Sequence, residues 1–397
     1  MEVIGSPLSL RSEPAPLEIS GEIINESKRK IKNKLLDRQA WEAVGQTLFR
    51  ALFPRQLRDI WERSLGGLPH GDSLYLRLDI RAPALAAIPW EIINDGTNYL
   101  ALTPQRPVVR DFYDQPSVLP ARRTGPVNIL LVVARPRDMQ PLPSVEREIK
   151  MIHDGVKELR DEGMVGRVDV LGDATAERLQ RQLRHGYEVV HFIGHGSFED
   201  ESGYLILDDG KGKAQRLDGQ TMSYLCQGCS PFLVFLNSCL GAVPSQRHLQ
   251  LGTAHAAVAS GVPAVVAMQS LIEDDLAAAF AGEFYSTLAE GRSIGVCVAE
   301  GRKAILRRVT PDRVDWAIPV LFGNASAAML DSPGREERRP HAKKVRPRSG
   351  VTVIVKDSKV GEVYNIQGDL NQIRVHGDGG AFGQRVIEDI FSRLPSK

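Results

Sequence analysis

The segments VVHFIGHG, residues 189–196, and FLVFLNSC, residues 232–239, are two apolar runs that each end at a reactive side chain. Their β-branched and aromatic residues, followed by glycine or small polar residues, are typical of strands buried on both faces of a parallel sheet. Ligands bind outside the carboxyl ends of the strands in such sheets, which is where His195 and Cys239 are expected. A thiol needs a nearby imidazole to form thiolate at neutral pH. The two segments therefore predict a cysteine nucleophile, Cys239, with His195 as its base.

The order of elements around the first segment predicts an α/β fold with a mainly parallel sheet flanked by helices. Apolar runs and helical spacing alternate before the histidine strand, as a strand at 127–134, a helix at 145–160, a strand at 168–171 and a helix at 176–183. This βαβαβ order implies parallel strands joined by crossover helices. Upstream, helical spacing over 31–53, a helix from Pro54 to Gly67 and an alternating strand at 74–80 predict an N-terminal helical and β subdomain.

The stretch 253–272 is small and apolar throughout, so that it is the one candidate for a membrane span. Gly261-Val262-Pro263 interrupts it. A helix ending near Ser260, a tight turn and a buried strand at 264–268 explain the stretch better than a bilayer helix. We therefore expect no membrane association.

Several separated motifs in one order resemble a known family. His195-Gly196 closes one strand and Asn237-Ser238-Cys239 closes a later one, as in the CHAT family of caspase-like (clan CD) cysteine peptidases, which is related to separases and metacaspases. Further family landmarks, in family order, are PWE at 89–91, GVPAVVA at 261–267, and Trp316 with PVL at 319–321. The similarity covers roughly residues 70 to 325 and implies a caspase-like domain.

The resemblance implies acyl transfer as the chemistry. Cys239 would attack a peptide bond, and His195 would act first as general base and then as general acid to the leaving amine. Backbone N–H groups, those of Gly196 and Cys239, would hold the oxyanion, because glycine lets the backbone approach the tetrahedral centre closely. In caspase-like folds a main-chain carbonyl can orient the histidine, so that no acidic third residue is required.

The resemblance is weakest at the specificity site. Metacaspase-like relatives have an acid just before the cysteine that helps to bind a basic P1 side chain, whereas this chain has the neutral amide of Asn237. We therefore do not expect a strictly basic P1 preference. Asp208 and Asp274 are weaker specificity candidates, since Asp208 is expected in a solvated loop and Asp274 precedes a helix, where negative charge favours the N-terminus.

Composition points to no particular partner and no cofactor. Fifty Lys and Arg residues against 49 Asp and Glu residues give a net charge of +1, which favours neither a nucleic-acid-binding protein nor an enzyme for acidic substrates. Four cysteines without a paired framework, and a first segment that does not resemble a signal peptide, predict a cytoplasmic protein. That compartment keeps a catalytic thiol reduced.

Cys226 and Cys229 have the spacing of half a zinc site or of a redox pair. A second pair is missing, and recruiting Cys239 with His195 or His191 would join two separate strand ends. The favoured interpretation is that the two cysteines pack a loop before Pro231, with no metal. His191, inside its apolar run, is expected to be a core histidine with satisfied hydrogen bonds.

Changes in composition divide the chain into four parts: 1–125, an N-terminal cap region; 126–330, the catalytic core; 331–350, a linker rich in Pro, Arg and Lys; and 351–397, a small β-rich module. A nucleic-acid or anionic-membrane patch is the alternative for the basic linker. Within the last part, strands are expected at 351–355, 361–366 and 372–375, and a helix at 383–394. So small a unit folds only marginally alone, so that we expect it to dock on the catalytic core or on another protein.

Together these observations predict a cysteine endopeptidase that cleaves a protein or peptide, with a regulator or recruiting protein at the C-terminal module. A bacterial signalling or defence context is only what the resemblance implies. The alternative from another class is a catalytically silent CHAT-like scaffold that acts through this module. A third alternative is a zinc or redox protein built on Cys226 and Cys229.

Overall fold

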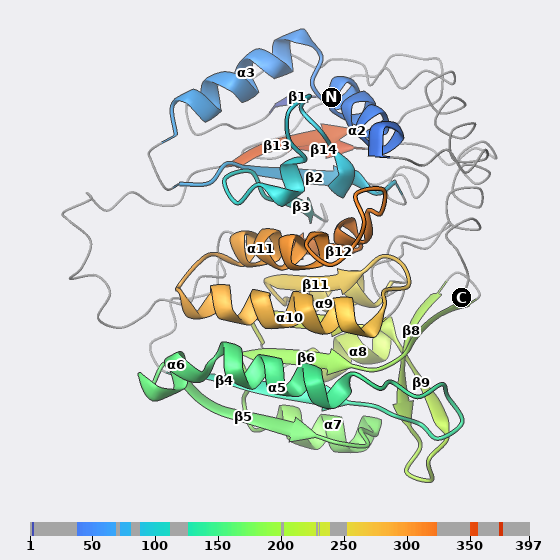
Figure 1. The fold of residues 1–397 in the computed structure, drawn as a ribbon. Coiled ribbons are helices and arrows are strands. Elements are labelled where there is room, and N and C mark those ends of the chain that lie inside the picture. Colours follow the sequence, from blue (N-terminus) through green and yellow to red (C-terminus); the bar gives the residue numbers. More distant parts are fainter. Residues whose placement is uncertain are drawn as a thin grey trace.

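The structure is a computed structural model, and it describes residues 2–3, 38–68, 72–80, 88–111, 126–199, 202–227, 229, 231–238, 252–323, 350–355 and 373–375. One eleven-stranded sheet runs through the molecule, and helices cover both of its faces (Figure 1). The strand order is β1-β13-β14-β2-β3-β12-β11-β10-β6-β4-β5. The predicted α/β class with a mainly parallel sheet flanked by helices is confirmed.

Five consecutive strands of the sheet are parallel: β5 (Val165–Leu171), β4 (Val127–Val133), β6 (Val189–Ile193), β10 (Leu233–Asn237) and β11 (Ala264–Met268). The last four are almost wholly buried because their residues are largely apolar, whereas β5, at the edge of the sheet, is partly exposed. The next strand, β12 (Pro319–Gly323), is antiparallel to β11. Beyond it lie β3 (Val108–Asp111) and β2 (Tyr75–Ile80), which are parallel to each other.

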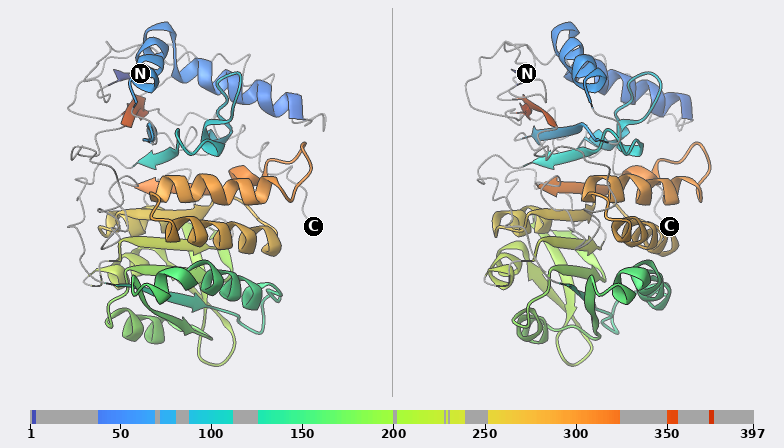
Figure 2. Two further views of the ribbon diagram at one scale, coloured as in Figure 1. Left: turned by 60° about the vertical axis from the view of Figure 1, so that its left-hand side comes forward. Right: turned by 90° about the vertical axis from the view of Figure 1, so that its left-hand side faces the viewer.

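Two groups of helices form the outer layers (Figure 2). On one face, residues of α5 (Val145–Gly155), α10 (Asp274–Ala289) and α11 (Ile294–Leu306) pack in the larger core cluster, and α6 (Lys157–Asp161) follows α5. On the other face, α7 (Ala176–Leu183), α8 (Gly219–Cys226) and α9 (Thr253–Ala259) pack in the second cluster. A separate antiparallel sheet, β7 (Gly196–Glu199), β8 (Ser202–Asp208) and β9 (Ala214–Asp218), follows β6.

Most predicted elements occur close to their expected bounds. The stretch 253–272 forms helix α9, a turn in which Gly261 has a φ of 96°, and strand β11, as expected. No helix within the described ranges is long and apolar enough to span a membrane. The helix expected over 145–160 instead divides into α5 and α6, because Val156 adopts a ψ of 5° between them.

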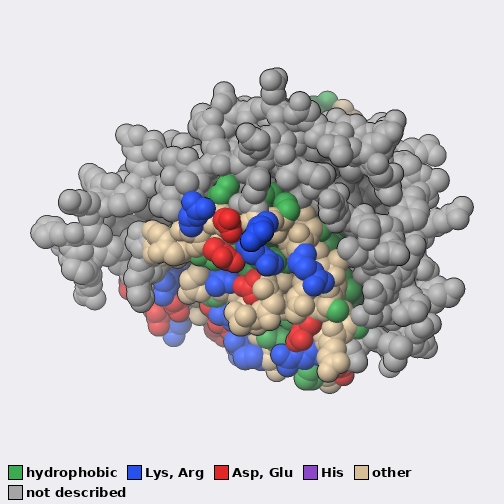
Figure 3. All heavy atoms as spheres, turned by 90° about the horizontal axis from the view of Figure 1, so that it is seen from above, with side chains coloured by type: hydrophobic (Ala, Val, Ile, Leu, Met, Phe, Trp, Pro, Cys, Tyr) green, Lys and Arg blue, Asp and Glu red, His purple; other side chains and the backbone are tan. Residues whose placement is uncertain are grey.

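The N-terminal part contributes α2 (Arg38–Leu52) and α3 (Arg55–Gly66), with Pro54 at the start of α3 as predicted. On the face seen from above, basic and acidic side chains lie close to one another (Figure 3), in keeping with a net charge of +1. Strands β2 and β3 belong to the same sheet as β4, so that the sheet crosses the predicted boundary between 1–125 and 126–330.

Two of the described strands come from the C-terminal part of the chain. β13 (Gly350–Val355) pairs in parallel with the first half of β2 and antiparallel with β1 (Glu2–Val3), while β14 (Ile373–Val375) pairs in parallel with the second half of β2. They match two of the three strands expected there. The strand expected at 361–366 and the helix expected at 383–394 lie outside the described residues, and the four-part division of the chain remains a prediction.

A buried polar cluster joins the N-terminal strands to the core. Nη2 of Arg110, on β3, donates to Oε2 of Glu91 at 2.5 Å and to Oε1 of Gln269 at 3.1 Å. Gln269 follows β11, and its Nε2 donates to Glu91 at 2.9 Å and to the carbonyl oxygen of Ala317 at 2.7 Å. All three side chains are buried, so that the cluster fixes the PWE landmark at 89–91 against the end of β11.

We expect Arg110→Met to lower the free energy of unfolding by about 3–5 kcal/mol, because it leaves the buried carboxylate of Glu91 without its cation. Denaturant titration followed by circular dichroism measures the loss. The double variant Arg110→Met with Glu91→Leu is the control and should recover most of it, since the carboxylate that lost its partner is removed as well. A loss below about 1 kcal/mol in the single variant would contradict the prediction, because that is the range of exposed ion pairs.

Candidate functional site

His195 lies where the main sheet gives way to the small antiparallel sheet. It follows β6 and precedes Gly196, the first residue of β7, and its carbonyl oxygen accepts from the N–H of Ile206 at 3.0 Å. The imidazole is partly exposed. Its Nε2 lies 2.7 Å from the carbonyl oxygen of Gln140, in the loop between β4 and α5.

This contact assigns the tautomer of His195. A carbonyl oxygen can only accept a hydrogen bond, so that Nε2 must carry the proton. In the neutral ring Nδ1 then has a free lone pair, which is the group that a general base needs. The carbonyl of Gln140 is a main-chain orienting group of the kind that the resemblance to caspase-like folds allows.

Strand β10 ends beside β6, and the register relates the two candidate catalytic residues. Asn237 pairs with Ile193, and both strands run in the same direction. His195 therefore lies two residues beyond one member of this pair, and Cys239 two residues beyond the other. Ser238 is buried. Cys239 itself, together with its backbone N–H, which we expect at the oxyanion, lies outside the described residues.

A buried polar cluster lies below this edge of the sheet. Nδ2 of Asn237 is 2.7 Å and 2.8 Å from the two carboxylate oxygens of Glu148, and Nε2 of His191 is 2.9 Å from Oε1. Nδ1 of His191 is 3.0 Å from the hydroxyl of Tyr285, and its ring stacks on Phe235 with a centroid distance of 4.2 Å. His191 is thus a core histidine with both nitrogens bonded, as the sequence indicated.

The proton positions in this cluster follow from its acceptors. Burial holds the pKa of the Tyr285 hydroxyl well above its usual value, so that the hydroxyl stays protonated and can donate to Nδ1 of His191. The carboxylate of Glu148 then accepts from the Nε2–H of the same ring. With Tyr285 as the donor to Nδ1, the hydrogen bonds run in one direction, from Tyr285 through His191 to Glu148.

Asp274 lies at the first turn of α10 and is close enough to His195 for the two charges to interact. Its carboxylate accepts from the backbone N–H of Ser144, which precedes α5. Burial is the main cause that raises the pKa of Asp274; Glu148 raises it further, whereas the Ser144 hydrogen bond and His195 oppose the rise. Of the two weaker specificity candidates, Asp274 is the one whose charge interacts with that of His195.

Asp208 has the contacts of a turn residue. Its Oδ1 accepts from the N–H groups of Gly210 at 2.6 Å and of Gly212 at 3.2 Å, which closes the turn between β8 and β9. The side chain is buried there rather than solvated as expected. These hydrogen bonds give Asp208 a structural task in the β8–β9 turn.

Burial raises the thiol pKa of each described cysteine, Cys226, Cys229 and Cys297. Cys226 and Cys297 are buried, and Cys229 is partly exposed. Burial raises the pKa of the Cys226 thiol to about 12, so that it stays protonated at neutral pH. Within the described ranges, no three His, Cys, Asp or Glu side chains are grouped to hold a metal ion.

Sequence reasoning did not single out Glu148 or Gln140. A signal for Glu148 does exist, since the buried positions of α5 are 145, 148 and 152, and a glutamate stands in the middle of this apolar stripe. A charged residue at a core-facing position needs a buried partner. Gln140 acts through its backbone carbonyl, for which residue type gives no signal.

The chain resembles several solved structures, including the following three. The separase–securin complex of Saccharomyces cerevisiae matches at 14% identity with a TM-score of 0.42, over 78% of this chain and 23% of that chain. The Arg-specific cysteine proteinase gingipain R matches at 12% identity with a TM-score of 0.46, over 80% and 82%. The complex of the Porphyromonas gingivalis RgpB pro- and mature domains matches at 11% identity with a TM-score of 0.47, over 78% of each chain.

The chain thus spans about a quarter of the separase chain that it matches. None of the curated proteins compared with the chain matches it significantly. The CHAT domain profile matches residues 42–324, which is most of the chain and includes all the landmarks quoted above. The chain belongs to the CHAT domain family.

Proposed function

We propose that the chain is a cysteine endopeptidase of the caspase-like type, with Cys239 as nucleophile and His195 as base. The observation that carries the proposal is the 2.7 Å contact between Nε2 of His195 and the carbonyl oxygen of Gln140. It leaves Nδ1 free to accept a proton, on a ring that is partly exposed at the carboxyl edge of the sheet. The register between β6 and β10 supports the assignment of Cys239 as the residue that this nitrogen serves.

The reaction begins when the thiol of Cys239 gives its proton to Nδ1 of His195. The thiolate attacks the carbonyl carbon of the peptide bond, and the oxyanion is held by the backbone N–H groups of Gly196 and Cys239. The imidazolium then protonates the leaving amine, so that the C–N bond breaks and an acyl-enzyme remains. Water, deprotonated by the neutral His195, hydrolyses the thioester and restores the thiol.

The competing proposal is a CHAT-like scaffold without catalysis. The presence of a base-competent tautomer at His195 favours the enzyme, because a scaffold has no need of it. The zinc or redox alternative on Cys226 and Cys229 receives no support from the buried, protonated Cys226 thiol. Metal analysis of the purified chain tests that alternative directly.

Cys239→Ala and His195→Ala should each abolish cleavage of a peptide bond, and the double variant should lose little more than either, because the two side chains act as one unit. Mapping of newly formed peptide termini, with each variant expressed beside wild type, measures this. Circular dichroism should show unchanged folding. Cys226→Ser and Cys229→Ser are the controls and should keep the activity. Equal cleavage by wild type and Cys239→Ala would contradict the assignment of Cys239 as the nucleophile.

The P1 preference should not be strictly basic. Asn237 supplies no charge, and the carboxylate of Glu148 behind it is buried and bonded to Asn237 and His191. In a panel of fluorogenic peptides, we expect kcat/KM for Arg or Lys at P1 to exceed that for Leu by less than about tenfold. A strict basic preference that disappears in Asp274→Ala or Asp208→Ala would place the pocket at that acid instead. Asp275→Ala, next to Asp274, is the matched control.

We further propose that residues 351–397 recruit a protein partner or regulator, in a bacterial signalling or defence module. The tail offers short strands, and its described strands β13 and β14 pair along the edge of β2. Strand pairing of this kind is a usual way for a segment to dock on a sheet. The basic linker predicted at 331–350 is long enough to connect the catalytic core with residues 351–397.

Deletion of residues 351–397 should leave hydrolysis of a short peptide largely unchanged and weaken cleavage or binding of the protein partner. Peptide turnover and partner pull-down with the truncated chain measure the two effects. A several-fold rise in basal turnover would show that the tail inhibits the core. Loss of folding would show that the tail belongs to the catalytic domain and that β2 needs β13 and β14 along its edge.

A further inference from the structure

Glu148 links the two strands that lead to the proposed catalytic residues. Through Nδ2 of Asn237 its carboxylate is bonded to the last residue of β10, and through Nε2 of His191 it is bonded to the middle of β6. Its side chain is only 4% exposed. One buried carboxylate therefore holds β10 two residues before Cys239 and β6 four residues before His195.

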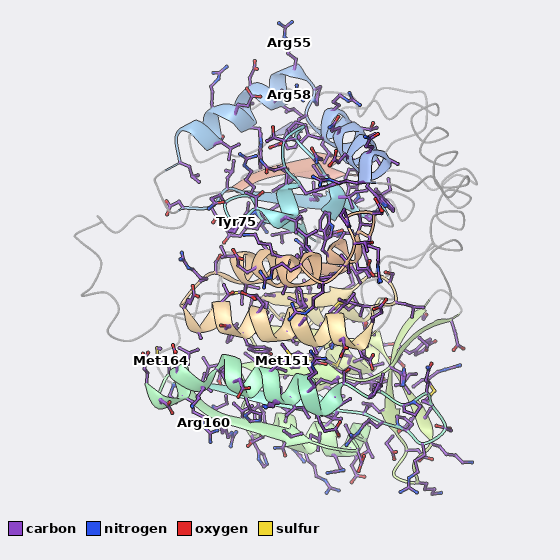
Figure 4. All side chains as sticks on the ribbon, viewed as in Figure 1. Arg55, Arg58, Tyr75, Met151, Arg160 and Met164 are labelled. Atoms are coloured by element: carbon purple, nitrogen blue, oxygen red, sulfur yellow. The ribbon has the colours of Figure 1, made fainter. Side chains whose placement is uncertain are left out.

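The helix that carries Glu148 is itself fixed. At its start, Ser144 donates from Oγ to Asp275 at 2.9 Å, and Nη1 of Arg147 donates to the same oxygen at 2.7 Å. Further along, Met151 lies on α5 toward α10 (Figure 4), where an added Cβ at Gly282 would come within 2.7 Å of the Met151 methyl carbon. Glu148 thus projects from a helix that is anchored to α10 on both sides of it.

We propose that Glu148 is a positioning residue that fixes the ends of β6 and β10 relative to each other, and through them the distance between His195 and Cys239. The inference rests on the proposed function, since it assumes that these two residues act together. Glu148 acts through Asn237 and His191 and is not itself in contact with the substrate. What matters in this role is that Glu148 hydrogen-bonds both Asn237 and His191, not that it is charged.

The contacts of Glu148 indicate that it holds Asn237 and His191 in place rather than binding the substrate. Asn237 is within hydrogen-bond distance of both carboxylate oxygens, and His191 engages one of them as well. A cation of the substrate would have to displace the amide of Asn237 in order to reach the carboxylate. Leaving a buried donor unpaired costs about 1–3 kcal/mol, so that Asn237 and His191 both hold Glu148 in place.

Two substitutions at position 148 distinguish the hydrogen bonds of Glu148 to Asn237 and His191, which we call the tether, from its negative charge. Glu148→Leu removes every acceptor and leaves the donors of Asn237 and His191 unpaired. Glu148→Gln removes the charge but preserves the tether: its oxygen can accept from His191, and its amide can donate to Oδ1 of Asn237 once that side chain has turned over. Tyr285→Phe is the matched control, because it removes a buried hydrogen bond on the far side of His191 and spares Asn237.

The experiment measures two quantities for each full-length variant: kcat and KM on a peptide substrate, and the rate at which iodoacetamide alkylates Cys239, followed by mass spectrometry. We expect Glu148→Leu to lower kcat by about a hundredfold with KM changed far less, because misplacement by about 1 Å has that effect. Its alkylation rate should fall toward that of His195→Ala. Glu148→Gln and Tyr285→Phe should stay within about threefold of wild type in both quantities.

Asn237→Ala removes the hydrogen bonds between Asn237 and Glu148 while keeping Glu148 itself. This variant keeps the test decisive if Glu148→Leu does not fold. It should lower kcat and the alkylation rate as Glu148→Leu does, and the double variant should lose no more than either single variant. Wild-type values in folded Glu148→Leu or in Asn237→Ala would overturn the positioning role. So would a Glu148→Gln variant that loses only the turnover of peptides with Arg at P1, because Glu148 would then be a charge that binds substrate.

The His195→Ala variant distinguishes this failure from failure of the proposed function. If Cys239 is alkylated at the same rate in wild type and in His195→Ala, then His195 and Cys239 do not act together as a catalytic dyad. In that case both the proposed function and the positioning role of Glu148 are wrong. If His195→Ala slows alkylation while Asn237→Ala and Glu148→Leu do not, the dyad stands and only the role of Glu148 is wrong.

Discussion

Strands β6, β10 and β11 are buried along their whole length, and this burial decides where the chain can place polar side chains. A polar group inside such a strand costs about 1–3 kcal/mol unless it finds a hydrogen-bond partner. His191 is the polar residue in the middle of β6, and it has partners on two helices. Asn237, the last residue of β10, is buried too and donates to Glu148, whereas His195 follows β6 and is partly exposed at the carboxyl edge of the sheet.

The close approach of α5 and α10 makes the buried cluster possible. An added Cβ at Gly155 would come within 3.1 Å of the backbone nitrogen of Ser286, and one at Gly282 would meet Met151. A larger side chain at either glycine would therefore push the helices apart. Since Glu148 projects from one helix and Tyr285 from the other, both could no longer reach His191, and the polar groups of the cluster would lose their partners.

A second buried cluster ties the N-terminal half of the family domain to the same edge. Glu91 of the PWE landmark bonds Arg110 and Gln269, and Gln269 follows β11 directly. Arg302 of α11, also buried, donates to the carbonyl oxygens of Pro319 and Ala101, and burial lowers its pKa to about 10. These contacts cross the boundary that the sequence suggested near residue 125, which agrees with a family match that begins at residue 42.

The sequence by itself determined the class of fold, the buried strands and the candidate catalytic pair, because continuous apolar runs and their polar ends are local patterns. It also indicated that His191 belongs to the core. Only the tertiary structure decided that the carbonyl of Gln140 orients His195, that Asp274 is close enough to interact with its charge and that Asp208 closes a turn. The same holds for Glu148: its place on the apolar stripe of α5 is visible in the sequence, but its partners come from β6 and β10, far along the chain. Such contacts depend on strand register and on the approach of two helices, which no local pattern specifies.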